Sequence, residues 1–361
     1  MKPVPPALRL ALLLPAPLAL IAGVLSGLAR LGLPTPAWFA GFIGQHGALM
    51  VCCVFGTLIS LERAVARNTA AAYAVPAACG IGTLALLAGA PPGIVAAIFV
   101  AASTGLQWQA VALSLRHREL HLACLALAAA AWLAGNLAWL AQVPQESAAT
   151  LPWTGFLILT IAAERLELSR LLPTPRPARI AFCVIAGVLL LAACADALAV
   201  LNADRLYGAA LCALALWLAR YDLARRTARM PALTGYIGRC LLSGYAWLAL
   251  AGLLALGGAL IPGSPLRDAA LHALMLGFVF TMVFGHAPII LPAVARVRLA
   301  WHRGFYLPLV ALHGSLALRI GAGLADSFPS RQVAAALNAL SLLLFLALVV
   351  AAIRRREIKR T

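Results

Sequence analysis

The chain has 361 residues, of which 63% are hydrophobic and 11% are charged. An ordinary soluble domain carries charge on roughly a quarter of its residues, so this composition excludes the soluble globular classes. The net charge of +17 would indicate nucleic-acid binding in a soluble protein, but here the positive residues lie in short loops between apolar runs. The composition therefore predicts an integral membrane protein with the lipid bilayer as its first partner and no nucleic acid.

Apolar stretches long enough to cross a hydrocarbon core of about 30 Å recur along the whole chain. They predict an all-α, polytopic membrane protein with twelve transmembrane helices in a single domain over residues 1–361. The spans are placed near 8–29, 38–61, 70–90, 93–115, 119–141, 150–168, 179–200, 205–224, 236–260, 268–292, 303–324 and 332–353. No small-residue cleavage site follows the first span, so we count it as a helix rather than a signal peptide.

The distribution of positive residues predicts how these spans are oriented. With twelve spans, the N-terminus, every second loop and the C-terminus carry 23 of the 28 Lys and Arg residues. The opposite loops carry only Arg30, Arg205, Arg267 and Arg331. Because positive residues are retained on the cytoplasmic side, both termini are predicted to be cytoplasmic. We expect such a protein in the inner (cytoplasmic) membrane of a cell.

Eight cysteines are present, all within predicted spans and none in a CxxC pair. In spans, cysteine behaves as a small apolar residue, so the pattern predicts neither a disulfide framework nor a zinc site. The adjacent Cys52 and Cys53 offer soft ligands for copper. Neighbouring residues on a helix point about 100° apart, so the side chains of these two cysteines diverge and do not form a ligand cluster for copper.

Histidines inside apolar spans are costly and indicate functional sites. Four lie there: His46, His272, His286 and His313. At a rise of about 1.5 Å per residue, the predicted span ends place the first, second and fourth in the outer half of the membrane and His286 near the cytoplasmic end. A b-type haem requires imidazole ligands at one height in the membrane. His313 is a further candidate metal ligand. In the alternative reading, each histidine bonds a neighbouring helix backbone.

The residues around two of these histidines resemble a known family. His46 begins a His-Gly-x-x-Met pattern similar to the second helix of subunit I of the haem–copper oxidases, and residues 272–282 are similar to its tenth helix. The resemblance implies that His46 and His272 are the axial ligands of one low-spin haem b. It also implies that Arg319, in the eleventh span, pairs with a haem propionate, although that family has two adjacent arginines there.

The sequence departs from the oxidases at their copper site. No histidine lies between His121 and His272, whereas that family has copper ligands on helices 6 and 7. This departure argues against oxygen reduction at a haem–copper centre. The reduced pattern looks closer to the NnrS family, twelve-span haem and copper proteins linked to nitric oxide stress. The resemblance thus implies electron transfer or nitric oxide handling, with a quinone or cytochrome as electron donor and, for an enzyme, a membrane haem oxidoreductase.

Glu-Arg pairs end the predicted helices 2 and 6, at Glu62 and Glu164. The oxidase subunit is built from three arcs of four helices in which helices 2, 6 and 10 are equivalent, so the pairs are consistent with such a repeat. Each pair is either an interfacial ion pair or, with His286, part of a proton route. His286 precedes Pro288 and either lines an inner cavity or bonds a carbonyl that the proline frees. A proton route belongs to the alternative function, a cofactor-free secondary transporter or exporter.

Overall fold

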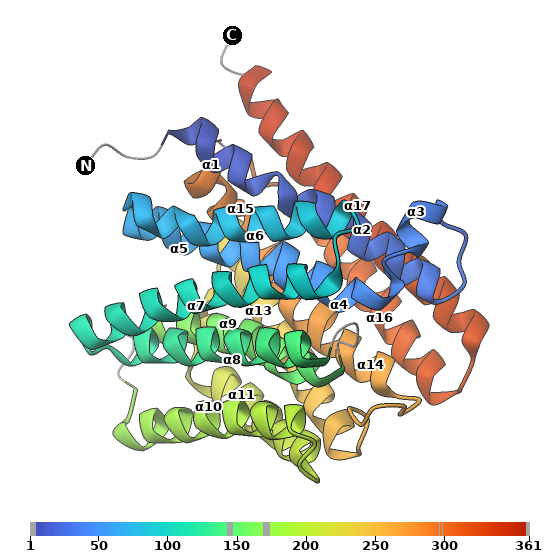
Figure 1. Ribbon diagram of the computed structural model, residues 1–361. Coiled ribbons are helices and arrows are strands. Elements are labelled where there is room, and N and C mark those ends of the chain that lie inside the picture. The colour runs from blue at the N-terminus through green and yellow to red at the C-terminus, as the bar shows by residue number, and fades with distance from the viewer. Residues whose placement is uncertain (1–4, 143–146, 169–173, 296, 298, 359–361) are drawn as a thin grey trace. The chain divides into compact units, whose positions relative to one another are not determined.

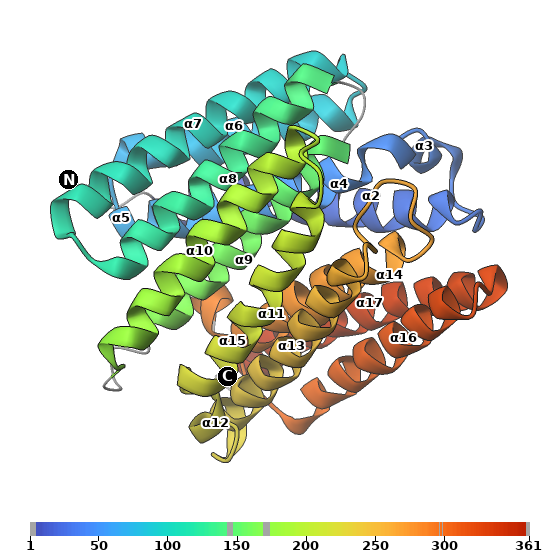
Figure 2. The ribbon, with the colours of Figure 1, turned by 90° about the horizontal axis from the view of Figure 1, so that it is seen from below.

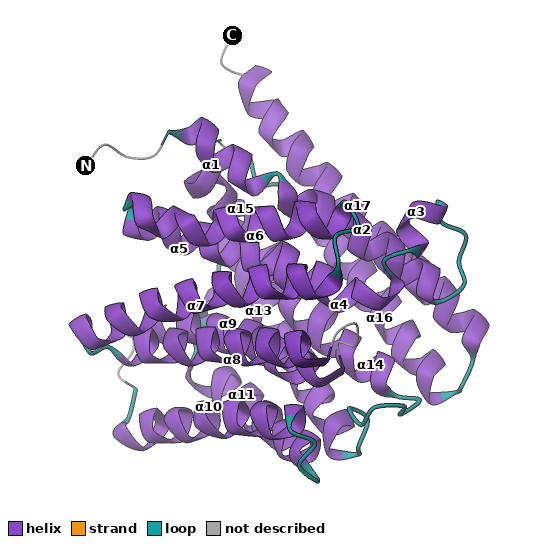
Figure 3. Ribbon diagram, viewed as in Figure 1, coloured by secondary structure: helices purple, strands orange, loops and turns teal. Residues whose placement is uncertain are grey.

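The computed structural model describes residues 5–142, 147–168, 174–295, 297 and 299–358. Six of the positive residues used for the orientation, Lys2, Arg170, Arg296, Arg298, Lys359 and Arg360, lie outside this part. Every regular element within it is a helix (Figure 3). The expected all-α class is therefore confirmed.

The helices follow the predicted spans closely, because the apolar runs end at Pro, Gly and charged residues that stop a membrane helix. The elements before residue 170 are α1 (Pro6–Leu13), α2 (Pro15–Arg30), α3 (Ala37–Ala40), η1 (Ile43–Gln45), α4 (His46–Ala48), η2 (Leu49–Gly56), α5 (Thr57–Arg67), η3 (Ala70–Tyr73), α6 (Ala74–Leu87), α7 (Pro92–His117), α8 (Leu120–Gln142), η4 (Ser147–Ala149) and α9 (Thr150–Leu168). The later elements are α10 (Arg176–Ala197), α11 (Ala203–Tyr221), α12 (Ala224–Thr227), α13 (Ala232–Leu256), α14 (Arg267–His272), η6 (Ala273–Phe280), α15 (Thr281–Ala295), η7 (Arg303–Phe305), α16 (Tyr306–Leu324) and α17 (Phe328–Ile358).

Ten helices in the described part of the chain are long and apolar enough to cross a membrane. Large apolar side chains on them point outward: Trp108 of α7 is 77% exposed, Leu216 of α11 is 70% exposed and Leu343 of α17 is 61% exposed. Repeated exposure of this kind is unfavourable in water and favourable against lipid chains. The chain is therefore a polytopic membrane protein whose outer surface suits a bilayer.

The chain divides into two compact units. The first unit comprises Met1–Glu164 and Leu190–Ala203, and the second comprises Arg165–Leu189 and Asp204–Thr361. The helices α9 and α10 each contain residues of both units. The expected single membrane domain stays a prediction, because compactness alone does not show that either unit folds by itself.

In the first unit, α6, α7 and α8 follow one another as packed neighbours, and α7 lies beside α8 (Figure 1). The fully buried Asn136 of α8 joins three other elements. Its Oδ1 accepts from Trp153 Nε1 at 2.9 Å and from Cys52 Sγ at 3.2 Å, and its Nδ2 donates to the Phe99 carbonyl at 3.1 Å. Where no water is available, this satisfied amide fixes α7, α8, α9 and η2 together.

In the second unit, η6 packs against both α13 and α16, and α16 lies beside α17 (Figure 2). Gly277 of η6 allows the close approach to α13, because a Cβ at this position would lie 2.5 Å from Cγ of Trp247. The Phe284 and Phe345 rings stack with centroids 3.9 Å apart and join α15 to α17. Small residues at helix contacts are the usual means of close packing in a membrane.

Gly135 of α8 gives a direct test of this packing. A Cβ at Gly135 would overlap the ring of Trp153, whereas a Cβ at Gly187 of α10 would meet no atom within 4 Å. We therefore expect Gly135→Ala to lower the free energy of unfolding by about 1–3 kcal/mol through overpacking. We expect the matched control, Gly187→Ala, to leave stability unchanged or to raise it by up to about 1 kcal/mol through helix propensity. Thermal unfolding in detergent checks both variants, and equal melting temperatures for the two would contradict the packing described.

Candidate functional site

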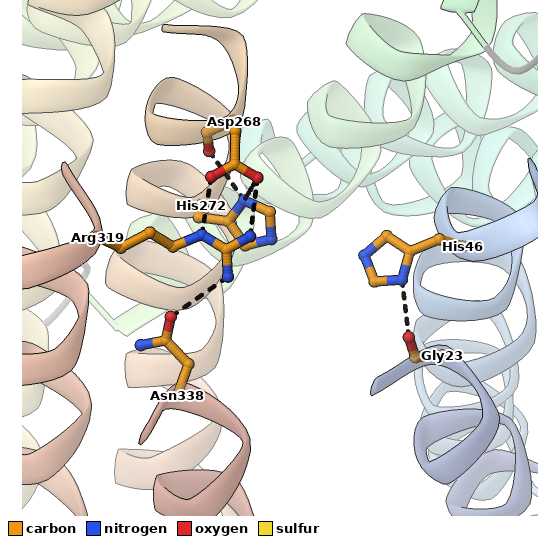
Figure 4. Close-up of polar contacts among 6 residues, drawn as sticks. All are labelled: Gly23, His46, Asp268, His272, Arg319 and Asn338. Carbon is orange, nitrogen blue, oxygen red and sulfur yellow. Dashed lines mark hydrogen bonds and ion pairs between the residues drawn. The ribbon is translucent and has the colours of Figure 1, made fainter. Parts of the chain in front are cut away.

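His46 lies at the start of the second span, against the first helix of its unit. Its Nδ1 is 2.7 Å from the carbonyl oxygen of Gly23 in α2, as Figure 4 shows. The ring also rests on Gly27, where a Cβ would come within 2.9 Å of the imidazole Cε1. Gly23 and Gly27 are one turn apart, so together they form a notch in α2 that receives the imidazole.

His272 ends α14 and is held by the residue one turn before it. Its Nδ1 lies 2.8 Å from the carbonyl oxygen of Asp268 and 3.3 Å from the Asp268 carboxylate (Figure 4). The side chain of His272 is 22% exposed, so one side of the ring is accessible. A carboxylate and a carbonyl behind Nδ1 fix the orientation of the ring, an arrangement common behind metal-ligating histidines.

Arg319 binds the same carboxylate from α16. Its Nε and Nη2 donate to the two Asp268 oxygens at 2.8 and 2.7 Å, and its Nη1 donates to Asn338 Oδ1 at 3.4 Å (Figure 4). Asn338 in turn donates to Ser315 Oγ at 2.7 Å. The Arg319 side chain is only 8% exposed, so its charge needs a partner inside the protein. Asp268 supplies that partner in bidentate geometry, which is the strongest form of such a pair.

The two histidines share one protonation pattern, which follows from their partners. A carbonyl oxygen can only accept, so Nδ1 of His46 and of His272 must carry the proton in each hydrogen bond. In a neutral imidazole the lone pair then resides on Nε2. Each ring is therefore in the tautomer that a metal ion bound at Nε2 requires.

Both histidines are followed by a π-helical segment. The segment η2 begins three residues after His46, and η6 begins directly after His272; each is eight residues long and is followed by a threonine that starts an α-helix. Thr281 closes η6 by donating its hydroxyl to the Leu276 carbonyl, five residues earlier. Wide turns of this kind are rare and are frequently found at functional sites, and α9, the sixth predicted span, contains none.

The observed span bounds move His46 closer to the end of its span and leave the position of His313 in its span as predicted. A turn after α3 interrupts the second helix, and the span begins at Ile43 rather than near residue 38. His46 and His272 are then three and five residues from the ends of their spans, about 5 and 8 Å in depth. His313 is eleven residues from Leu324, about 16 Å from that end and near the middle of α16.

Both ring nitrogens of His313 have partners in the second unit. Trp247 Nε1 donates to His313 Nδ1 at 2.8 Å, and His313 Nε2 lies 3.1 Å from Ser243 Oγ. Since an indole N–H can only donate, Nδ1 carries the lone pair and Nε2 carries the proton. This arrangement uses the lone pair that a metal would need, so it favours a role for His313 in joining α16 to α13.

His286 bonds a backbone carbonyl, but not the one that the second sequence-based reading expected. Its Nδ1 lies 2.7 Å from the Met282 carbonyl, whereas Pro288 removes the amide that would bond Phe284. The acceptor is therefore not the carbonyl that the proline frees. The His286 Nε2 atom is buried and has no hydrogen-bond partner among the described residues. It is thus a third imidazole with its lone pair on Nε2.

The carboxylates of Glu62 and Glu164 are brought together by one guanidinium. Arg63 Nη2 lies 3.4 Å from Glu62 Oε1 and 2.5 Å from Glu164 Oε1, all within the first unit. One guanidinium that bonds two carboxylates is the arrangement of an ion pair at a helix end. The geometry therefore favours the interfacial ion pair over a proton route.

The soft sulfur ligands do not gather into a metal site. Cys52 is buried, and its Sγ bonds Asn136 and receives the Trp132 Nε1 hydrogen at 3.5 Å. Across the residues that the structure describes, no group of three or more His, Cys, Asp or Glu side chains is arranged to hold a metal ion.

Sequence reasoning missed three residues of the candidate site. Asp268 is one turn before His272, and this acidic residue at i−4 within a span was the available signal. Gly23 and Gly27 form a GxxxG pattern in the first span, which typically marks a close helix contact. Neither pattern identifies the residue that these positions contact, and only the tertiary structure shows that contact.

The chain was compared with models of protein families and with curated proteins. The profile of a family described as "Domain of unknown function (DUF8744)" matches residues 9–354. No protein in the curated set matches the chain.

The Arg319–Asp268 pair predicts a large effect of removing one charge. Asp268→Asn leaves the nearly buried Arg319 charge without its carboxylate, which costs about 3 kcal/mol or more. The matched control, Asp326→Asn, removes a carboxylate that is 85% exposed and lies 3.2 Å from Arg331, which costs about 1 kcal/mol or less. We expect a clear fall in melting temperature in detergent for Asp268→Asn alone. An equal small effect for both variants would contradict the role assigned to Asp268.

Proposed function

We propose a haem-binding function for this chain, which belongs to the family described as a domain of unknown function, DUF8744. In this proposal His46 and His272 are the two axial ligands of one haem b. The observation that carries it is their shared tautomer, with Nδ1–H bonded to a backbone carbonyl and the lone pair on Nε2. Two neutral imidazoles of this form are the axial ligand set of a membrane-buried b-type haem.

The chemistry of the donor set fits the group. A haem supplies four ring nitrogens itself, so the protein contributes only two ligands and needs no cluster of three or more side chains. Asp268 is positioned to hold the His272 ring through Nδ1, and Arg319 to hold Asp268. Arg319 already has an internal carboxylate, so its charge does not require the propionate partner that the resemblance implies. Its role in the proposal is to fix Asp268 behind the ligand.

Bound haem would supply one-electron transfer. With two protein nitrogens filling both axial positions, electron transfer is favoured over binding of a gas such as nitric oxide, which would have to displace a histidine. A membrane quinone or a cytochrome is the expected electron donor. Nitric oxide handling remains the second expectation from the resemblance to the NnrS family.

The proposal also gives the chain twelve membrane spans. Both termini are in the cytoplasm, and the membrane is the inner membrane of the cell. The helices α9 and α11 would add the sixth and eighth spans to the ten candidates. Each has 19 residues, about 28 Å of helix, which nearly equals the thickness of a hydrocarbon core. Their charged residues lie in the first or last turns, such as Asp204 and Arg220 in α11, where they reach the interface. The three-arc plan of the oxidase subunit is part of the same proposal.

The alternative function is a cofactor-free secondary transporter or exporter. It would use His286, Glu62 and Glu164 as proton carriers. The guanidinium of Arg63 bonds both carboxylates, and this ion-pair arrangement weighs against the route.

The haem proposal is tested on the purified protein by a dithionite-reduced minus oxidised difference spectrum. We expect the bands of a low-spin b-type haem in the wild type and their loss in His46→Gly and in His272→Gly. Added imidazole is expected to restore the low-spin spectrum of either variant, because it fills the space of the removed ring. His117→Gly, which removes an exposed histidine at the end of α7, is the control and is expected to keep the full spectrum.

Two outcomes would contradict the proposal. One is a well-folded wild-type preparation, expressed with sufficient haem, that shows no haem band. The other is a full low-spin spectrum in both His46→Gly and His272→Gly without imidazole. Retention of haem by those variants and its loss in His286→Gly would move the ligand assignment to His286.

A further inference from the structure

A basic cavity lies in the second unit, at the end of α11 and beside α12. Its volume is about 440 Å³, which is within the range of small-molecule sites. Four arginines contribute to its wall, two of them on α12 itself. The lining residues are Thr174, Pro175, Arg220, Tyr221, Asp222, Arg225, Arg226 and Arg229.

The positive charge in this basic cavity is not neutralised from within. Arg220, Arg225, Arg226 and Arg229 are exposed, and none of them forms an ion pair in the described part of the chain. Arg220 contacts only the ring of its neighbour Tyr221, at 5.3 Å from the centroid. Guanidinium groups that gather without partners around a concave space create a positive potential that attracts anions.

Asp222, the carboxylate in the lining, directs one oxygen to other elements, while its buried Oδ1 has no hydrogen-bond partner among the described residues. Its Oδ2 accepts from the Tyr245 hydroxyl at 2.7 Å and from the Ala224 amide at 3.2 Å. The side chain is buried and serves to fix the turn between α11 and α12 against α13. It therefore shapes the cavity while leaving the guanidinium groups available to a ligand.

The retention of positive residues on the cytoplasmic side of membranes accounts for how many arginines occur in this loop. It does not account for their convergence on one cavity, since orientation by charge works equally well when the residues are spread over a convex surface. The concave arrangement is the additional observation, and it points to a ligand.

We propose that the basic cavity binds a phosphate-bearing anion. The planar guanidinium group matches the geometry of phosphate oxygens and binds them in bidentate fashion. Several such groups around one cavity of this size suit a phosphate ester rather than a single small ion.

The phosphate group can come from an anionic phospholipid or from a soluble phosphate compound. Leu216, 70% exposed, lies one turn before Arg220 on α11, and Met230, 50% exposed, directly follows Arg229. Apolar side chains next to the cavity mouth would contact an acyl chain whose headgroup lies among the arginines. The two sources are separated by the probes used below.

The test measures binding to the purified full-length protein in a neutral detergent, by thermal shift and by native mass spectrometry. The probes are phosphatidylglycerol, the zwitterionic phosphatidylcholine, and pyrophosphate. The variant is Arg225→Gln with Arg229→Gln, and the matched control is Arg116→Gln with Arg303→Gln, which removes two exposed arginines outside the cavity. Circular dichroism and ligand-free melting check that both double variants are folded.

We expect affinity for an anionic probe to fall by roughly tenfold or more in Arg225→Gln with Arg229→Gln, because each lost charge-assisted bond contributes at least about that factor. The control is expected to bind as the wild type does. If the double variant loses affinity for phosphatidylglycerol, the ligand is a lipid headgroup. If it loses affinity for pyrophosphate alone, the ligand is a soluble phosphate compound. Equal binding by both double variants, or no binding of either anionic probe to the wild type, would overturn the proposal.

Discussion

Polar groups placed within apolar membrane helices must find their partners inside the protein, and this constraint explains the arrangement of Arg319, Asn136 and His313. Arg319 meets Asp268, Asn136 bonds three neighbours, and His313 is held at both ring nitrogens. Each of these contacts joins different helices. The few polar residues in a largely apolar chain therefore determine which helices pack together.

The same constraint distinguishes His46 and His272 from structural histidines. In His313 the lone pair lies on Nδ1 and accepts the Trp247 hydrogen, which favours a structural role. The partners of His46 and His272 instead fix the proton on Nδ1, and the Asp268 pair with Arg319 leaves the His272 ring with a rigid support on one side. This arrangement is how proteins orient an imidazole toward a metal. The histidine tautomers, rather than the histidine count, link the fold to the proposed haem.

The positions of the helices could be predicted from sequence because hydropathy and chain breakers are local properties. The interruption before Ile43 was missed, since residues 37–42 are apolar enough to continue the helix. The π-helical segments after His46 and His272 have no recognised sequence signal, because they depend on how neighbouring helices pack. Asp268 and Arg319 are 51 residues apart, so their pairing is a tertiary property that no single-sequence pattern specifies.

The central claim is that two imidazole nitrogens, from His46 and His272, bind one haem iron. Low-temperature electron paramagnetic resonance of the oxidised, purified protein tests this claim most directly, because the signal reports the axial ligands of ferric iron. The account predicts a low-spin ferric signal of bis-imidazole type, which disappears when either histidine is replaced. A folded protein without a haem signal, or with a high-spin signal of a single histidine ligand that neither replacement changes, would contradict it.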